Sequence, residues 1–192
     1  RDLLRGFDTG RVGTVESSGY SAIVDYRLGD DITLKSITAW REYDGTFSHD
    51  PDQSPLTLQS VQNFVGNEQF TQELRLSGEA GDGRLFYTLG AFYLDSESTL
   101  QGLVHIPPIP GTYFGALGFV QDDRITTDNS SLFGHAEYAL GERTQVFGGL
   151  RYTDEDKLYY FDHTPELTIT DPGGEPYSRT DWRLGLSYEA AD

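Results

Sequence analysis

Hydrophobic and polar residues alternate along most of the chain. In one example, Phe70, Leu74 and Leu76 fall on one side of the alternation, whereas Glu73 and Arg75 fall on the other. A period of two is typical of a β-strand with one apolar and one polar face. No helical periodicity is found that could cover so many apolar faces, so the pattern predicts an all-β chain.

The alternation predicts about seven strands joined as an antiparallel up-and-down meander. It weakens between residues 36 and 39, so the pattern does not fix the register of the second strand. The predicted strands lie at 19–28, 32–46, 68–79, 85–100, 125–140, 144–161 and 178–190.

The predicted connections are of two kinds, which alternate along the chain. Short turns are expected at 29–31, 80–84 and 141–143, and long loops at 47–67, 101–124 and 162–177. All short turns therefore lie at one end of the sheet, as in transmembrane barrels of the outer-membrane type, whose strands need about 9–11 tilted residues. Aromatic residues lie near the ends of the apolar faces, where a membrane-interface girdle requires them: Tyr20, Trp40, Phe70, Tyr138, Tyr152, Trp182 and Tyr188.

The composition excludes several classes of partner and of functional site. The 192 residues carry a net charge of −17, with 14 Lys and Arg against 31 Asp and Glu, which argues against a nucleic-acid partner. Cysteine is absent, which excludes thiolate metal sites, cysteine nucleophiles and disulfides. Methionine is also absent, and no signal peptide follows Arg1, so we expect a processed form or a piece of a longer protein.

The longest segment without a charged residue, 98–121, does not predict a transmembrane helix. Its prolines remove backbone donors that lipid cannot replace, and several glycines interrupt it. We expect an apolar loop there.

No constellation of residues predicts catalysis, a cofactor or a metal. The histidines at 49, 105, 135 and 163 are isolated in sequence, which favours surface or lumen positions. The acidic runs at 122–123 and 154–156 favour solvated strand ends, although the second could hold a divalent cation near lipopolysaccharide. Phosphate-loop, nucleophile-elbow and zinc-protease motifs are missing, so we expect no enzyme.

Five sequence segments, in this order along the chain, resemble the β-barrel of TonB-dependent outer-membrane receptors. Together they cover roughly residues 15–190, and although each is weak alone, the set is specific. The segments occupy 68–78, 89–94, 129–138, 149–155 and 182–186.

The resemblance implies a plugged barrel of the 22-stranded kind in the outer membrane of a Gram-negative bacterium. It implies import of a scarce ligand, a ferric siderophore first, otherwise cobalamin or an oligosaccharide. The implied partners are outer-membrane lipid and lipopolysaccharide, a plug domain, the TonB system and the small-molecule ligand. Neither a plug nor a TonB box is found, and about seven strands cannot close such a barrel. We therefore expect residues 1–192 to be one part of a receptor barrel.

One loop offers candidate ligand contacts. If the long loops are extracellular, Tyr113, Phe114 and Phe119 display aromatic rings that stack well on sugars or catecholates. We favour the alternative that this loop packs against neighbouring loops, because the function of a loop depends on the partners that surround it. In the strands, five charged residues are expected to face the lumen and to pair across strands: Glu73, Arg75, Glu137, Arg151 and Arg183.

Rival interpretations remain open at this point. A soluble, lectin-like β-sandwich module would also show alternation and long loops. A small closed porin-like barrel would need an even number of strands. A barrel-embedded enzyme comes last, because no nucleophile constellation is present.

Overall fold

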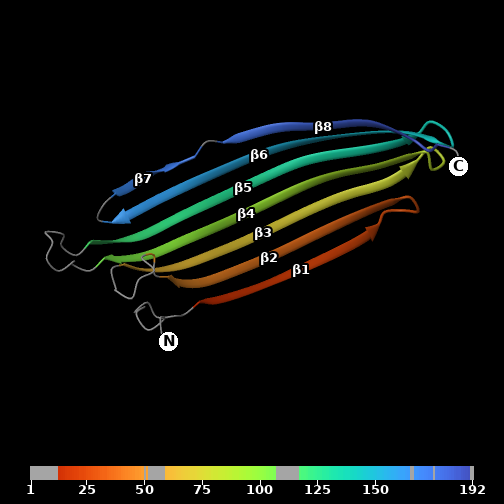
Figure 1. Ribbon diagram of the computed structural model, residues 1–192. Helices are drawn as coiled ribbons and strands as arrows, with labels where there is room; N and C mark the ends of the chain where they lie inside the picture. Colours follow the sequence, from red (N-terminus) through yellow and green to blue (C-terminus); the bar gives the residue numbers. More distant parts are fainter. Residues whose placement is uncertain are drawn as a thin grey trace.

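The computed structural model describes residues 13–49, 51, 59–106, 117–164, 167–174 and 176–190, and all regular structure in them is β-strand in one antiparallel sheet (Figure 1). The strands pair in the order β1 to β7, and β8 pairs with β6. Apart from the short β7, they form an up-and-down meander, which confirms the predicted fold class. The strands are β1 (Thr14–Arg27), β2 (Ile32–His49), β3 (Ser60–Ala80), β4 (Leu85–Ile106), β5 (Leu117–Ala139), β6 (Thr144–Thr164), β7 (Leu167–Gly173) and β8 (Tyr177–Tyr188).

Most strands are longer than predicted. β3 begins at Ser60, β4 continues to Ile106 and β5 begins at Leu117, so the predicted loops at 47–67 and 101–124 are wrong over much of their length. Polar and apolar residues are mixed on both faces in these extensions, which weakens the alternation, yet the backbone ladder continues from Ser60 opposite His105. The predicted loop at 162–177 similarly contains β7, which pairs with β6.

The three short turns are confirmed, and they lie together at the right-hand end of the sheet in Figure 1. Leu28 N–H donates to Ile32 O at 2.9 Å, and Leu140 N–H donates to Thr144 O at 2.9 Å. Between β3 and β4, residues 81–83 all have positive φ, which glycine at two of the three positions permits without strain.

The register of β2, left open by the sequence, is continuous. Tyr20 on β1, Trp40 on β2 and Phe70 on β3 lie in one row, and the ladder runs unbroken from Ile32 to His49. Side chains in one row point to the same face of a sheet. The apolar residues of the first three strands therefore share one face.

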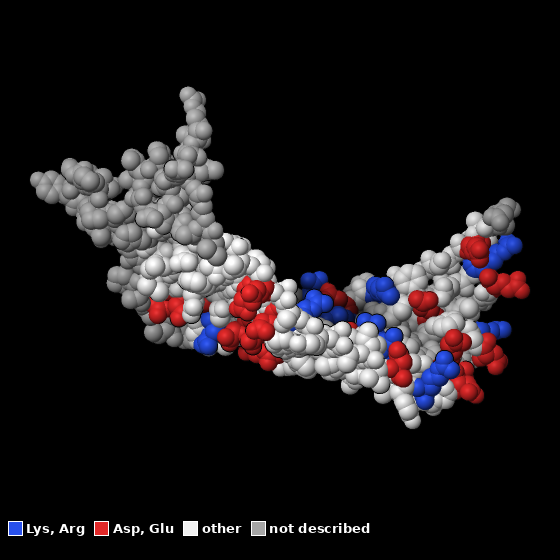
Figure 2. Space-filling model, turned by 90° about the horizontal axis from the view of Figure 1, so that it is seen from below, with Lys and Arg blue, Asp and Glu red and all other residues white. Residues whose placement is uncertain are grey.

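The sheet is a single layer without a central hydrophobic core. Among the described side chains, the buried ones include Val61, Val104, Asp123 and Ser131, and all four lie on the same face by register. Figure 2 shows the sheet curved into a shallow trough with Lys and Arg side chains in its hollow. We call this face the inner face. It carries the odd-numbered residues of β1, β2, β3, β5, β6 and β8 and the even-numbered residues of β4.

The single layer decides between the rival interpretations. A β-sandwich requires a second sheet against the apolar face, and the described residues form only one sheet. A small closed barrel requires its first and last strands to pair, whereas among the described residues β1 pairs only with β2, and β8 only with β6. No described helix has the length and apolar character needed to span a membrane.

Candidate functional site on the two faces of the sheet

The outer face carries a continuous apolar band. Its large side chains are strongly exposed, with 76% of Trp182 and 73% of Leu184 accessible. Aromatic rings lie six residues apart on this face in three strands, which is roughly 20 Å along an extended strand. These pairs are Tyr20 and Tyr26 on β1, Tyr87 and Tyr93 on β4, and Trp182 and Tyr188 on β8. Apolar bands flanked by aromatic girdles are typical of lipid-facing barrel walls.

The girdle on the long-loop side is built from ring contacts between neighbouring strands. Tyr20 stacks on Trp40 with ring centroids 6.1 Å apart, and Phe70 lies 6.5 Å from Tyr93. The Tyr93 hydroxyl donates to Asp128 at 3.3 Å, so its polar end points away from the apolar band.

Beyond this girdle the outer face becomes acidic. Among its described residues, Arg124 alone is basic there. The acidic residues are Glu16, Glu42, Asp44, Glu68, Asp95, Glu97, Asp122, Asp128, Asp154, Asp156 and Asp162. Much of the net charge of −17 therefore lies on this part of the outer face.

The turn-end half of the inner face is charged, as predicted, but its pairing differs from the prediction. Glu73 forms an ion pair with Arg75 on its own strand rather than across strands. Arg151 donates to Ser131 at 3.0 Å, and Arg183 contacts His135 at 3.1 Å. Among the described residues, neither of these two arginines lies within ion-pair distance of a carboxylate.

Phenylalanine rings support the two arginines. The Arg151 guanidinium lies 5.8 Å from the ring centroids of Phe92 and Phe133, and that of Arg183 lies 5.9 Å from Phe147. Such cation–π contacts hold an arginine in place without neutralising it.

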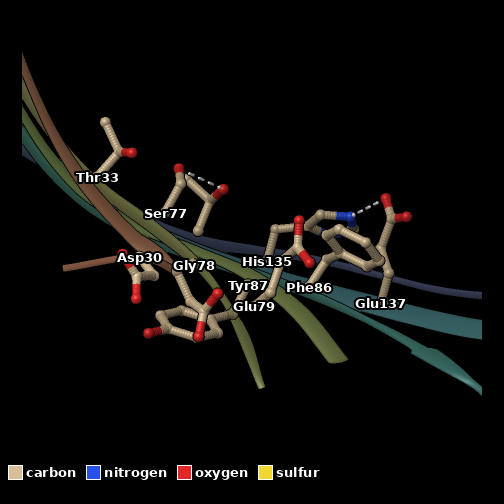
Figure 3. Close-up of a pocket in the computed structure, with 11 residues that line it drawn as sticks. Asp30, Thr33, Ser77, Gly78, Glu79, Phe86, Tyr87, His135 and Glu137 are labelled. Atoms are coloured by element: carbon tan, nitrogen blue, oxygen red, sulfur yellow. Dashed lines mark hydrogen bonds and ion pairs between the residues drawn. The ribbon is translucent and has the colours of Figure 1, made fainter. Parts of the chain in front are cut away.

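A cavity of about 500 Å³ opens at the turn end of the inner face (Figure 3). Ser77 and Thr88 form a hydrogen bond of 3.0 Å in its wall, and His135 lies 2.9 Å from Glu137. Glu137 also accepts from Gln145 at 2.8 Å. His135 thus lies on the inner face, one of the two kinds of position expected for the histidines, but it has a neighbour, because the alternation places it beside the carboxylate of Glu137 two residues along the same strand.

In the described residues, the long-loop half of the inner face has few charged side chains and mixes amides and hydroxyls with apolar residues. Asn67 donates to Ser98 at 2.8 Å and to Ser96 at 3.2 Å. The side-chain oxygens of Asn63 and Gln121 both lie close over Gly102, at 3.0 and 3.2 Å from where a Cβ would stand. This surface can bind ligand groups through neutral hydrogen bonds.

Asp123 is the exception in this neutral region, and it is satisfied within the sheet. The residue is 5% exposed, and its carboxylate accepts from Gln121 at 2.6 Å and from the Tyr159 hydroxyl at 3.2 Å. His163 Nε2 lies 3.5 Å from the same carboxylate. Burial, and next the charge of Asp123, raises the pKa of Tyr159. The prediction of a solvated acidic end holds for Asp122 but is wrong for Asp123.

The second acidic run divides between the faces. Asp154 and Asp156 lie exposed on the outer face, whereas Glu155 lies on the inner face and accepts from Asn129 at 2.9 Å. No cluster of three or more potential metal ligands occurs in the part of the chain that the structure describes.

The predicted aromatic ligand contacts remain predictions. Tyr113 and Phe114 lie outside the described residues. Phe119 lies in β5 and its backbone pairs with Val104 of β4, but its side chain is outside the described part of the structure too. The inner-face amides were not singled out from the sequence, because single Asn and Gln residues carry no motif.

Comparison with known proteins gives the family. Residues 2–192 match the family model described as TonB dependent receptor-like, beta-barrel. No curated protein sequence matches significantly.

Solved structures share the fold. The ferric yersiniabactin uptake receptor of Yersinia pestis is 17% identical with a TM-score of 0.66, over 93% of this chain and 26% of that one. The siderophore receptor PiuA of Acinetobacter baumannii is 15% identical with a TM-score of 0.72, over 92% and 30%. The ferric-catecholate import receptor Fiu of Escherichia coli K12, in its closed form, is 12% identical with a TM-score of 0.61, over 95% and 32%. At these identities the likeness shows the fold alone.

Proposed function

This chain belongs to the TonB-dependent receptor β-barrel family, and we propose that it forms part of the barrel wall of a receptor that imports a scarce ligand. It is an outer-membrane chain of a Gram-negative bacterium, from a family of receptors rather than of enzymes. The chain spans about a third or less of the length of the solved receptors that it matches.

The observation that carries the proposal is the difference between the two faces of one sheet. The outer face has an apolar band with exposed Trp182 and Leu184 between aromatic girdles, whereas the inner face has ion pairs and amides. A wall between lipid and a polar lumen requires this division.

The open edges of the sheet suggest how the wall is completed. In the described chain, the outer edges of β1 and β8 have no partner strand. Unpaired strand edges cannot be left in lipid, because every backbone polar group there needs a hydrogen bond. We propose that further strands of the same receptor pair with these edges. In this proposal a plug domain fills the lumen against the charged half of the inner face, and import depends on the TonB system.

The proposed ligand is a ferric siderophore in the first place, otherwise cobalamin or an oligosaccharide. The names of the solved relatives refer to siderophores, which supports this order. Tyr113, Phe114 and Phe119 are proposed contacts at the extracellular side, since aromatic rings stack on sugar or chelate rings.

Uptake by the full-length receptor tests this function. Cells expressing it as their only siderophore receptor are given labelled ferric siderophore, with a strain lacking TonB as the control. We expect accumulation only when both the receptor and TonB are present. Accumulation independent of TonB would contradict the proposal. Replacing Tyr113 and Phe114 with Ala tests the loop, because unchanged ligand affinity would rule out their contact.

A further inference from the structure

We infer that the part of the ligand that meets this wall segment is an uncharged, hydrogen-bonding surface rather than a polyanion. This inference rests on the proposed import function and specifies the substrate class of the same lumen. The inference is based on how charged residues are distributed along the inner face from the turns to the long loops.

The inner face changes character along its strands. Near the turns it carries Lys35, Arg75, Arg151 and Arg183. Arg41 and Lys157 lie in one row across the sheet, and they are the last described Lys and Arg residues of the inner face on the way from the turns to the long loops. In the described rows beyond it, towards the loops, the inner face has no Lys or Arg. Polar and apolar residues are mixed there, and they include Tyr43, Asn63, Asn67, Ser98, Gln121 and Tyr159 together with Val61, Val65, Leu100, Val104 and Ile125.

The charged side chains near this neutral zone already form ion pairs or hydrogen bonds with their neighbours. Lys157 lies 3.8 Å from Glu155, which itself accepts from Asn129. Asp123 is buried and accepts hydrogen bonds from its neighbours on β5 and β6. An incoming ligand therefore meets neutral donors and acceptors on this wall.

Neutrality is specific to the inner side and is not a property of these strand segments as a whole. Asp44 and Glu97 lie on the outer face, whereas their immediate neighbours in the same strands, Gly45 and Ser98, lie on the inner face. The same backbone thus carries many acidic groups outside and almost none inside. In an acidic chain, the loop-side part of the inner wall, which has no described Lys or Arg, offers little attraction to an anion.

Ligand chemistry follows from this pattern. A ferric tris-catecholate is a polyanion, and its recognition requires Lys or Arg to offset desolvation of its charge. A ferric tris-hydroxamate is neutral, and a neutral oligosaccharide shares its surface of oxygen acceptors and polar donors. Amide side chains bind such groups with directional hydrogen bonds, and the rings of Tyr43 and Phe47 offer stacking faces on this side.

Three probes separate the possibilities in the purified full-length receptor. Binding of a neutral ferric tris-hydroxamate, a neutral linear oligosaccharide and a ferric tris-catecholate is measured at low and at high salt. We expect one of the two neutral probes to bind, with an affinity that salt changes less than about twofold, because uncharged contacts are not screened. The neutral probe that binds identifies the source of the shared chemistry.

Variants at Asn63 locate the contact. Asn63→Lys and Asn63→Asp each place a charge in the neutral zone, and we expect each to weaken the neutral ligand about tenfold. Asn63→Gln should retain most of the affinity. Thr126→Lys on the outer face is the matched control and should change nothing. Migration before and after heating confirms that each variant is assembled.

The other outcomes are equally informative. Tighter binding of the catecholate than of either neutral probe, strengthened by Asn63→Lys, would overturn the inference and leave the import function standing. Failure of all three probes to bind would count against the inference and the proposed siderophore function together. The order of the probes in the unaltered receptor does not depend on any variant folding.

Discussion

Arg183 on β8 reaches His135 on β5 across the intervening strand β6, with its Nη2 atom 3.1 Å from the imidazole. Gly149 on β6 lies between them and has no side chain to block the contact. His135 Nε2 lies 2.9 Å from Glu137, so donation to that carboxylate leaves Nδ1 to accept from Arg183. Three neighbouring strands are thereby joined on the lumen side by side chains as well as by backbone.

Replacing Gly149 with Ala should weaken this wall. The new Cβ would stand 3.2 Å from His135 Nδ1 and 3.3 Å from Gly134 O, closer than ordinary contact. We expect a loss of about 1–3 kcal/mol in unfolding free energy, typical of overpacking. Urea unfolding of the full receptor in vesicles measures it.

The adjacent Gly148 provides the control. It faces outward, and a Cβ there would meet Leu184 Cδ1 at 3.6 Å, an ordinary distance. Gly148→Ala should leave the unfolding midpoint nearly unchanged. Equal losses for the two variants would contradict a specific role for the space at Gly149.

Asp123 and Asp122 form a second matched pair. Asp123→Ala removes the acceptor of the partly buried Gln121 amide and Tyr159 hydroxyl, which should cost about 0.5–1.5 kcal/mol of stability. Asp122 is exposed on the outer face, so Asp122→Ala should cost much less. Thermal unfolding of both variants distinguishes them, and indifference at Asp123 would show that its hydrogen bonds contribute nothing net.

These residues also show where sequence reasoning succeeds and where it stops. The face of Phe70 and that of Arg75 follow from alternation, because burial on one side imposes a period of two. The extension of β3 back to Ser60 could not be found this way, because amides and hydroxyls occur on both faces there. The burial of Asp123 depends on Gln121 and on Tyr159 of the neighbouring strand, and no property of an Asp-Asp pair in sequence carries that information.

Tyr159 should titrate above its ordinary pKa of 10.0. Burial and the Asp123 carboxylate favour the neutral phenol in the folded state, so the pKa is higher there than in the unfolded chain. The associated stability is fully present below pH 10 and is lost as the pH rises through the raised pKa. The tyrosinate absorbance difference between the unaltered receptor and Tyr159→Phe measures this titration. Asp123→Asn should move it back towards the ordinary value; no movement would exclude Asp123 as a cause.

A charged side chain should cost more free energy on the lipid-facing apolar band than on the lumen-facing side. Two residues of β8, Leu184 and Ser187, allow a direct comparison. Leu184 is on the outer face between Trp182 and Tyr188 and is 73% exposed on the sheet, so in the membrane it contacts lipid. Leu184→Arg should cost about 2–4 kcal/mol if it lies near the bilayer midplane. Ser187→Arg on the inner face should cost little, because a lumen-facing guanidinium keeps its water. The fraction of receptor that reaches the heat-modifiable, assembled state in outer membranes reports the difference. If Ser187→Arg impaired assembly more than Leu184→Arg, the assignment of the two faces would have to be reversed.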